Sequence, residues 1–218
     1  EELQNEEGKK VRDGDILYAV LTLRKNEFQA YRFITSDGKK DYYNPEGESV
    51  RKTLFKTPIK GAFISSGYGM RNSPILGYSR FHPGIDLATR HGTPIMASGD
   101  GTVTIIGYND VYGNYIKLSH ANEYGTLYAH LSRVSNGLSK GKEIAQGDII
   151  GYVGSTGMST GPHLHYEVWY RGRQINPAAV EFPPRRVLKG DERAAFFQEK
   201  RRLLRISRKL SAPPPEPN

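Results

Sequence analysis

The segment Gly161-Pro162-His163-Leu164-His165-Tyr166-Glu167-Val168-Trp169 alternates polar and apolar residues in the manner of a half-buried β-strand. Successive side chains of a strand point to opposite faces, so residues two apart share a face. His163 and His165 therefore project together, and two adjacent imidazoles favour a metal or a polar cleft over a simple solvent-facing pair. Glu167 lies on the same face, where it either supports the histidines or is merely exposed. The residues expected to face the core are Leu164, Tyr166 and Val168.

Outward from this strand, residues 57–180 contain further short runs of strand-forming residues, separated by turns rich in glycine, asparagine and aspartate. Short strands at this spacing indicate an all-β sandwich or barrel. No helix longer than two turns is expected in this region. The candidate strands cover residues 102–108, 115–119, 126–129, 149–153 and 163–170.

Residues 1–56 form a first segment, with strand-like runs at 16–23 and 28–34 and a shorter one at 42–43. This pattern predicts a small antiparallel sheet. Fewer than about 60 residues without disulfides are marginal as an independent domain. The segment is therefore expected to pack on the next domain or to belong to a module that begins upstream. The opening residues are acidic and polar and show no signal peptide, so a signal or anchor is expected to lie outside this sequence.

Residues 181–218 differ in composition: Pro183-Pro184 ends the last strand, and residues 194–210 hold strong helix formers with Asp191 as the expected N-cap. Apolar positions recur every seven residues on a helix that is otherwise rich in lysine and arginine, which favours a surface helix docked on the body of the protein. The alternative is a basic amphipathic contact with an anionic envelope or membrane surface. The last eight residues, four of them proline, are expected to be disordered. The apolar repeat consists of Phe196, Leu203 and Leu210, widened by Phe197 and Leu204.

Composition narrows the possible chemistry. The 218 residues include no cysteine, which removes disulfides, thiolate metal sites and cysteine nucleophiles. The net charge is +8, but ten basic and three acidic residues lie between Arg185 and Lys209, so the rest of the chain is close to neutral. Motifs for nucleic-acid binding are missing, and no nucleic-acid partner is expected. No apolar run approaches the roughly 18–20 residues of a membrane-spanning helix.

Two further places combine histidine with a possible partner. His82 and Asp86 stand four residues apart, although Pro83-Gly84 between them disfavours a helix. A loop that enters a strand can also bring both side chains together, and imidazole with carboxylate is a common pair of zinc ligands. Alone, this spacing is a weak signal because it arises often by chance. His130 lies at the end of a candidate strand, where a single histidine is usually structural. It becomes a candidate site residue only together with the other histidines.

The remaining histidines have plainer interpretations. His91 lies in a turn and is expected at the surface, whereas His120 ends a strand and is expected to fix that end by hydrogen bonding. The glycine-rich residues 154–161 resemble a phosphate loop only in glycine content, since a strand follows and the Gly-Lys-Ser/Thr ending is missing. The sequence has no Gly-x-Ser-x-Gly nucleophile elbow.

Three motifs taken together resemble one family: His82-x-x-x-Asp86, Tyr128-Ala129-His130-Leu131 and residues 159–168. They are similar to those of the LytM/lysostaphin-type zinc metallopeptidases, which cut peptidoglycan peptides. The resemblance runs from about residue 61 to 178, with its motifs in the family's order and spacing. Supporting segments lie at residues 66–71, 92–97, 99–101 and 147–151.

The flanks carry a looser resemblance, to cell-wall D,D-endopeptidases of Gram-negative envelopes. It rests on Asp41-Tyr42-Tyr43, residues 55–58 and residues 190–193. It implies that residues 1–56 are the C-terminal part of an upstream β-rich domain, followed by a metallopeptidase domain at 57–180 and a basic helix with a proline-rich tail at 181–218. The implied fold is an antiparallel β-sandwich or open barrel with a small N-terminal β segment and a C-terminal helix.

Carried over residue by residue, the family pattern makes His82, Asp86 and His165 the ligands of one Zn²⁺ per chain. It makes His130 and His163 the catalytic histidines that do not bind the metal. All five positions match. One of the two free histidines is expected to accept a proton from water, and the other to stabilise the oxyanion or protonate the leaving amine. The sequence does not assign these two roles.

The resemblance thus implies a zinc-dependent endopeptidase that hydrolyses peptidoglycan cross-links, with those containing D-Ala favoured over glycine bridges. It would act in cell-wall remodelling, in the periplasm or cell envelope. The sequence indicates no obligate protein partner. One alternative is a non-catalytic wall-binding module that activates another hydrolase; the five intact positions count against it. Another is a latent enzyme, blocked at the metal by the loop around Asn72 or by residues upstream of Glu1.

Overall fold

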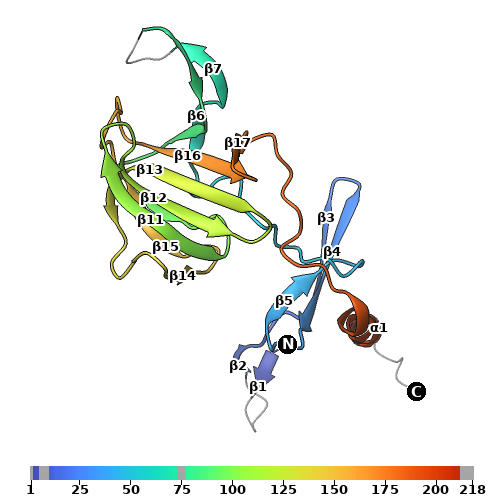
Figure 1. The fold of residues 1–218 in the computed structure, drawn as a ribbon. Helices are drawn as coiled ribbons and strands as arrows, with labels where there is room; N and C mark the ends of the chain where they lie inside the picture. Colours follow the sequence, from blue (N-terminus) through green and yellow to red (C-terminus); the bar gives the residue numbers. More distant parts are fainter. Residues whose placement is uncertain (1, 5–9, 73–76, 212–218) are drawn as a thin grey trace, which may run out of the picture. The chain divides into compact units, whose positions relative to one another are not determined.

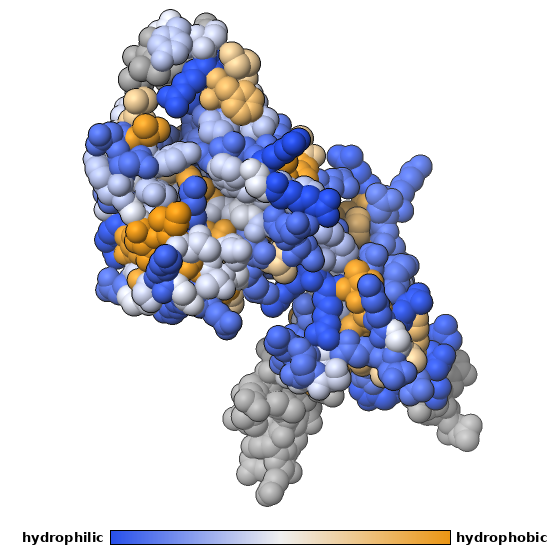
Figure 2. All heavy atoms as spheres, viewed as in Figure 1, coloured by the Kyte–Doolittle hydropathy of each residue, from blue (hydrophilic) through white to orange (hydrophobic). Residues whose placement is uncertain are grey.

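The computed structural model describes residues 2–4, 10–72 and 77–211 (Figure 1). The chain divides into two compact units. The larger unit is Thr53–Phe182, and the smaller one joins Glu1–Lys52 to Pro183–Asn218. On the face seen in Figure 2, hydrophilic residues cover most of each unit, and hydrophobic residues form a few patches.

The larger unit is built from antiparallel strands, which confirms the all-β prediction. Its main sheet follows the order β14-β11-β12-β13-β16-β9-β6, and within the described residues this path does not close into a barrel. β15 pairs with β13 and β10, β17 pairs with β16, and β7 and β8 form a separate hairpin. The strands are β6 (Phe63–Ser66), β7 (Gly69–Asn72), β8 (Ser79–His82), β9 (Ile85–Ala88), β10 (Pro94–Met96), β11 (Gly101–Asn109), β12 (Gly113–His120), β13 (Tyr124–Val134), β14 (Glu143–Ile144), β15 (Ile149–Val153), β16 (His163–Tyr170) and β17 (Arg173–Ile175).

The five strands predicted in this unit correspond to β11, β12, β13, β15 and β16. Leu164, Tyr166 and Val168 of β16 face the core as predicted, each with an exposed fraction of 0%. Burying a side chain of this size stabilises the fold by about 1.5–3 kcal/mol. The strand is not half-buried, however, because His165 and Glu167 on its other face are buried too. β9 was not predicted, since it has only four residues and directly follows Pro83-Gly84. The core around β16 includes Leu87, Ile95, Ile116, Tyr128, Leu131, Leu164, Tyr166 and Val168.

The smaller unit contains the predicted antiparallel sheet and the predicted helix. The helix packs on the sheet, since Phe196 and Leu203 are buried together with Tyr31 and Tyr43. The apolar repeat of the helix therefore packs against the sheet of the same unit. The side chain of Leu210 and residues 212–218 lie outside the described part of the chain. The elements are β1 (Glu2–Gln4), β2 (Lys10–Asp13), β3 (Tyr18–Leu23), β4 (Asn26–Ile34), β5 (Lys40–Tyr43) and α1 (Gly190–Ser211).

The start of α1 differs from the prediction. The helix begins at Gly190, and the carbonyl of Lys189 accepts a hydrogen bond from the Arg193 amide. Asp191 is therefore not the N-cap but a first-turn residue, where its carboxylate still interacts favourably with the positive end of the helix dipole. Among the described helices, none is both long and apolar enough to cross a membrane.

Candidate active site

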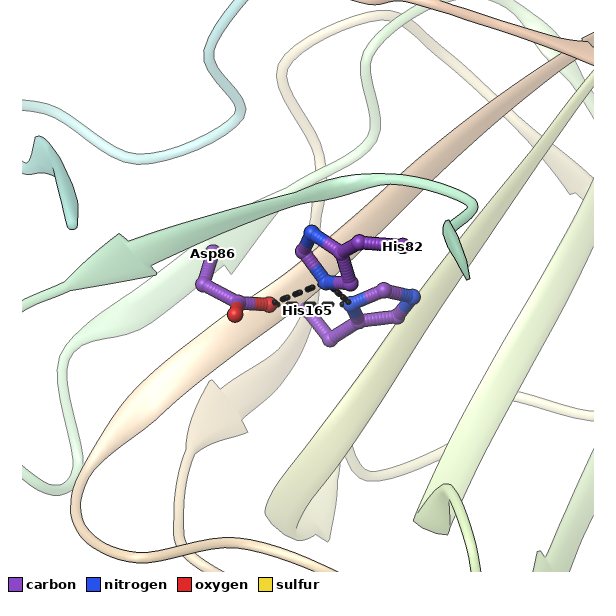
Figure 3. A group of neighbouring side chains, drawn as sticks. All are labelled: His82, Asp86 and His165. Carbon is purple, nitrogen blue, oxygen red and sulfur yellow. Dashed lines mark hydrogen bonds and ion pairs between the residues drawn. The ribbon is translucent and has the colours of Figure 1, made fainter. Parts of the chain in front are cut away.

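Two consecutive strands and a third one that is distant in sequence bring the predicted metal ligands together (Figure 3). His82 is the last residue of β8, and Asp86 lies in β9 after a two-residue turn. β9 pairs with β16 in a register that places Asp86 directly opposite His165. The turn is closely packed: a Cβ atom on Gly84 would lie 2.4 Å from the Tyr166 carbonyl oxygen. Glycine at this position allows β8 to turn into β9 against β16.

The facing atoms of these three side chains form a small triangle. His82 Nε2 lies 3.0 Å from His165 Nδ1 and 3.0 Å from Asp86 Oδ1, and His165 Nδ1 lies 2.9 Å from the same oxygen. All three residues are buried, with exposed fractions of 5–8%. They are the group of potential metal ligands found among the described residues.

Both histidines have a hydrogen-bond acceptor at the ring nitrogen that points away from the triangle. His82 Nδ1 lies 2.7 Å from the Gly67 carbonyl oxygen, which can only accept, so Nδ1 carries the proton. His165 Nε2 donates to Glu167 Oε1 at 3.1 Å for the same reason. The opposite ring nitrogens, His82 Nε2 and His165 Nδ1, both face the Asp86 carboxylate and are the atoms that would bind a cation there.

Three electron-rich atoms this close together require a cation or a proton between them. Nitrogen and oxygen donors suit zinc, whose tetrahedral ligands, at bond lengths of 2.0–2.2 Å, lie about 3.3–3.5 Å apart. The observed triangle is slightly smaller, and the residues fit such an ion. Burial acts to raise the pKa of Asp86, but hydrogen bonds with His165 and His82 outweigh it and hold this pKa below its ordinary value.

Glu167 is buried and supports His165; the alternative that it is merely exposed is wrong. Its two oxygens accept four hydrogen bonds, so the carboxylate is held at a defined position and orients the His165 ring. The partners Tyr112 and Gln174 were not predicted, because only the folded pairing of strands brings them near Glu167. The donors are His165 Nε2 at 3.1 Å, the Tyr112 hydroxyl at 2.8 Å, Trp169 Nε1 at 2.9 Å and Gln174 Nε2 at 3.2 Å.

The two other predicted histidines lie beside the triangle, with ring centroids 4.7 Å apart. His130 Nδ1 donates to the Thr156 carbonyl at 2.8 Å, and His163 Nδ1 donates to the Gly161 carbonyl at 2.8 Å. Each ring is thereby fixed in the tautomer that keeps a lone pair on Nε2. His163 Nε2 lies 3.8 Å from Asp86 Oδ1. Both imidazoles can therefore exchange a proton next to the candidate metal centre.

An irregular backbone carries His130 toward the site. Its φ angle is 61°, in the left-handed region that costs a residue other than glycine of the order of 1–3 kcal/mol. The pairing of β12 with β13 shifts register here, and Tyr128 and Leu131 both face the core although they are three residues apart. A hydrogen bond from the His130 amide to the Tyr112 carbonyl holds the irregularity.

Burial lowers the pKa of His130 to about 4, against a smaller opposing effect of the Thr156 carbonyl. The ring is therefore neutral at neutral pH and able to accept a proton on Nε2.

All five residues predicted from the motifs line one cavity of about 640 Å³. The two histidines that were not predicted to belong to the site, His91 at the surface and His120 at a strand end, lie elsewhere. His91 is exposed in a turn, and His120 is buried at the end of β12, where Nδ1 donates to the Asp100 carbonyl at 2.8 Å. The cavity wall also holds residues that the sequence analysis did not single out, among them Arg71, Arg80 and Tyr112.

The comparisons with known proteins identify the family of this domain. Residues 80–177 match the model of peptidase family M23, and this span contains all five predicted site residues. Through this domain the chain belongs to peptidase family M23. The resemblance inferred from the motifs is thereby confirmed.

The similarity to curated relatives extends beyond the M23 domain. DD-carboxypeptidase/endopeptidase Mpg of Neisseria meningitidis is 39% identical over 89% of this chain, and peptidoglycan DD-endopeptidase ShyC of Vibrio cholerae is 35% identical over 93%. The chain spans 46% of the length of each. The crystal structure of a zinc-containing peptidase from Vibrio cholerae has a TM-score of 0.57 and 32% identity, and the match covers 78% of this chain and 51% of that one.

Proposed function

We propose that the M23 domain is a zinc-dependent endopeptidase that hydrolyses peptide cross-links of bacterial peptidoglycan. One observation carries the proposal: three potential ligand atoms lie within 3.0 Å of one another, beside two histidines whose Nδ1 atoms each donate to a backbone carbonyl. Relatives named peptidoglycan DD-endopeptidase and DD-carboxypeptidase/endopeptidase support the substrate class.

His82, Asp86 and His165 would hold one zinc ion through Nε2, a carboxylate oxygen and Nδ1 respectively. Three protein ligands leave room for water or substrate, as catalytic zinc sites require. When bound, the ion would lower the pKa of water toward about 7 and polarise a peptide carbonyl. Glu167 and the Gly67 carbonyl keep the two imidazoles in the tautomers that make this binding possible.

His130 and His163 would carry out the proton transfers. In each ring Nδ1 is committed to a backbone carbonyl, so Nε2 is the working atom. Neutral Nε2 accepts a proton from the attacking water. Once protonated, the same atom donates to the oxyanion or to the leaving amine. One histidine would serve as base and the other as donor, a division of roles that variants of each residue can assign.

The cleaved bond and the cellular location are proposed from the names of the relatives. Both relatives carry DD-peptidase names, which supports D-Ala-containing cross-links as the substrate and cell-wall remodelling as the role. The enzyme would then work in the periplasm or cell envelope. Contact with an anionic surface would have to use the lysines and arginines of α1, because Phe196 and Leu203 are already buried against the small sheet.

The test is cleavage of purified cross-linked muropeptides by the zinc-loaded chain, with products identified by mass. The expected result is conversion of dimers to monomers, abolished by a chelator and restored by zinc. Cleavage that persists in the chelator would contradict the zinc mechanism. Bound zinc without cleavage would favour a latent enzyme, and a chain with neither zinc nor cleavage would favour a wall-binding module that activates another hydrolase.

A further inference from the structure

Two arginines face each other across the β7–β8 hairpin at the wall of the cavity. Arg71 on β7 is the direct cross-strand partner of Arg80 on β8, and both side chains line the cavity that contains the candidate metal centre. Directly opposed residues of an antiparallel pair lie on the same face, and like charges in that arrangement are destabilising. A hairpin that places two positive charges there gains when an anion binds between them.

The two guanidinium groups differ in how many of their hydrogen-bond donors already have a partner. Arg71 Nη2 forms an ion pair with Asp86 Oδ2 at 3.0 Å, while its buried Nε has no hydrogen-bond partner. Arg80 is exposed, and it forms no ion pair with a carboxylate of the described residues. Arg80 therefore keeps its full donor capacity for a ligand, whereas Arg71 also belongs to the support of Asp86.

The charge balance of the cavity also favours an anion. Asp86 is the acidic residue of its lining, and both of its oxygens already have partners in His82, His165 and Arg71. A bound divalent cation would add further positive charge. Planar guanidinium groups match the two oxygens of a carboxylate, and such charge-assisted hydrogen bonds are stronger than neutral ones.

We propose that Arg71 and Arg80 form a carboxylate-binding subsite, in which Arg80 determines the preference of the enzyme for acidic peptides. The inference rests on the proposed function, because it assigns part of the same cavity to a carboxylate of the peptide substrate. That carboxylate is either the C-terminal group of the peptide or a carboxyl group within it. Arg80 carries the test, since a change at Arg71 would also disturb Asp86.

The experiment uses synthetic D-Ala-cross-linked peptides in three forms: with free carboxylates, with only the C-terminus amidated, and with every carboxylate amidated. Cleavage kinetics and fluorescence anisotropy of labelled peptides are measured for the zinc-loaded wild type, Arg80→Ala and Arg80→Lys. Arg173→Ala is the matched control, because Arg173 is exposed on β17 and outside the cavity lining. Bound zinc is measured for every variant.

The wild type should prefer the free-carboxylate peptide, and Arg80→Ala should lower this preference about tenfold through KM and binding, with zinc content retained. Arg80→Lys should restore part of it, and Arg173→Ala should behave as wild type. Loss of the preference on C-terminal amidation alone identifies the terminal carboxylate as the ligand, whereas loss only on full amidation identifies an internal one. Equal binding of all three peptides by the wild type, or equal weakening of all three by Arg80→Ala, would overturn the subsite. Carboxylate-dependent binding without cleavage would leave the subsite standing and count against the proposed activity instead, in favour of a latent enzyme or a binding module.

Discussion

His120 and His130 occupy two regions of the same sheet and look alike by most measures. Both are buried, with exposed fractions of 7% and 6%, and both donate Nδ1–H to a backbone carbonyl at 2.8 Å. The difference lies at the second nitrogen. His120 Nε2 is 2.7 Å from the Thr126 hydroxyl, which is 3.0 Å from the hydroxyl of Tyr128. His130 lines the cavity, and its Nε2 has no hydrogen-bond partner among the described residues.

Burial and a lowered pKa therefore do not identify a functional histidine. Burial is the leading cause of the lowered pKa in both residues. What separates them is that His130 has one nitrogen anchored and the other available, and that its backbone adopts a costly left-handed conformation to reach the cavity. His120 uses both nitrogens to hold the fold together.

The largest effect is expected for the candidate metal ligands. His82→Ala or Asp86→Ala should lose zinc and lower turnover by about 10³-fold or more, because the ion is worth several kcal/mol of transition-state stabilisation. Zinc content by mass spectrometry and dimer cleavage check this together. Retention of stoichiometric zinc by either variant would contradict the ligand assignment.

The next effect separates His130 and His163 from the ligands. His130→Ala and His163→Ala should each keep zinc and lose about 10²–10⁴-fold in turnover, the usual contribution of a positioned acid or base. The free energy of unfolding should fall no more than in His120→Ala, since in each variant one backbone carbonyl loses its partner. If His163→Ala loses the metal, the roles of the two histidines on β16 are reversed.

His120→Ala should give the opposite result. We expect the turnover of the folded enzyme and its zinc content to be unchanged, and the free energy of unfolding to fall by about 1–3 kcal/mol, because the Thr126 hydroxyl and the Asp100 carbonyl lose their partner. Urea denaturation measures the loss. A variant that is fully stable but inactive would remove the distinction drawn between the two regions.

The smallest effect is a pH dependence of stability that belongs to His120. Its pKa in the folded protein lies below the ordinary value of 6.5, chiefly through burial, so below pH 6.5 the unfolded chain binds the proton more readily. The stability difference between wild type and His120→Ala should therefore shrink as the pH falls below 6.5, by at most about 1.4 kcal/mol per pH unit. A difference that is constant from pH 8 to 5 would contradict a neutral, buried His120.

Local pattern was sufficient to predict much of this molecule. The alternation of β16 placed Leu164 in the core and His165 on the opposite face, because a strand has a fixed period of two. The metal-site candidates followed from motif resemblance rather than from spacing alone, since β9, which carries Asp86, is too short to recognise. The partnership of Tyr112 with Glu167 spans 55 residues and depends on strand pairing, which a single sequence does not specify.

The site features that remained hidden are those set by backbone detail. The left-handed conformation of His130 accompanies a register shift between β12 and β13. A histidine in the sequence does not predict a positive φ angle. The opposition of Arg71 and Arg80 depends likewise on the register of a hairpin whose residues 73–76 lie outside the described part of the chain. The sequence motifs identified the reactive residues, but only the folded structure shows which of their atoms face the cavity.

A crystal structure of the zinc-loaded chain tests the central claim most directly. The account predicts one zinc ion bound by His82 Nε2, an Asp86 oxygen and His165 Nδ1, with Glu167 still accepting from His165 Nε2 and with His130 and His163 not bound to the metal. Zinc bound through His163, or through His165 Nε2 with the Glu167 hydrogen bond broken, would contradict it.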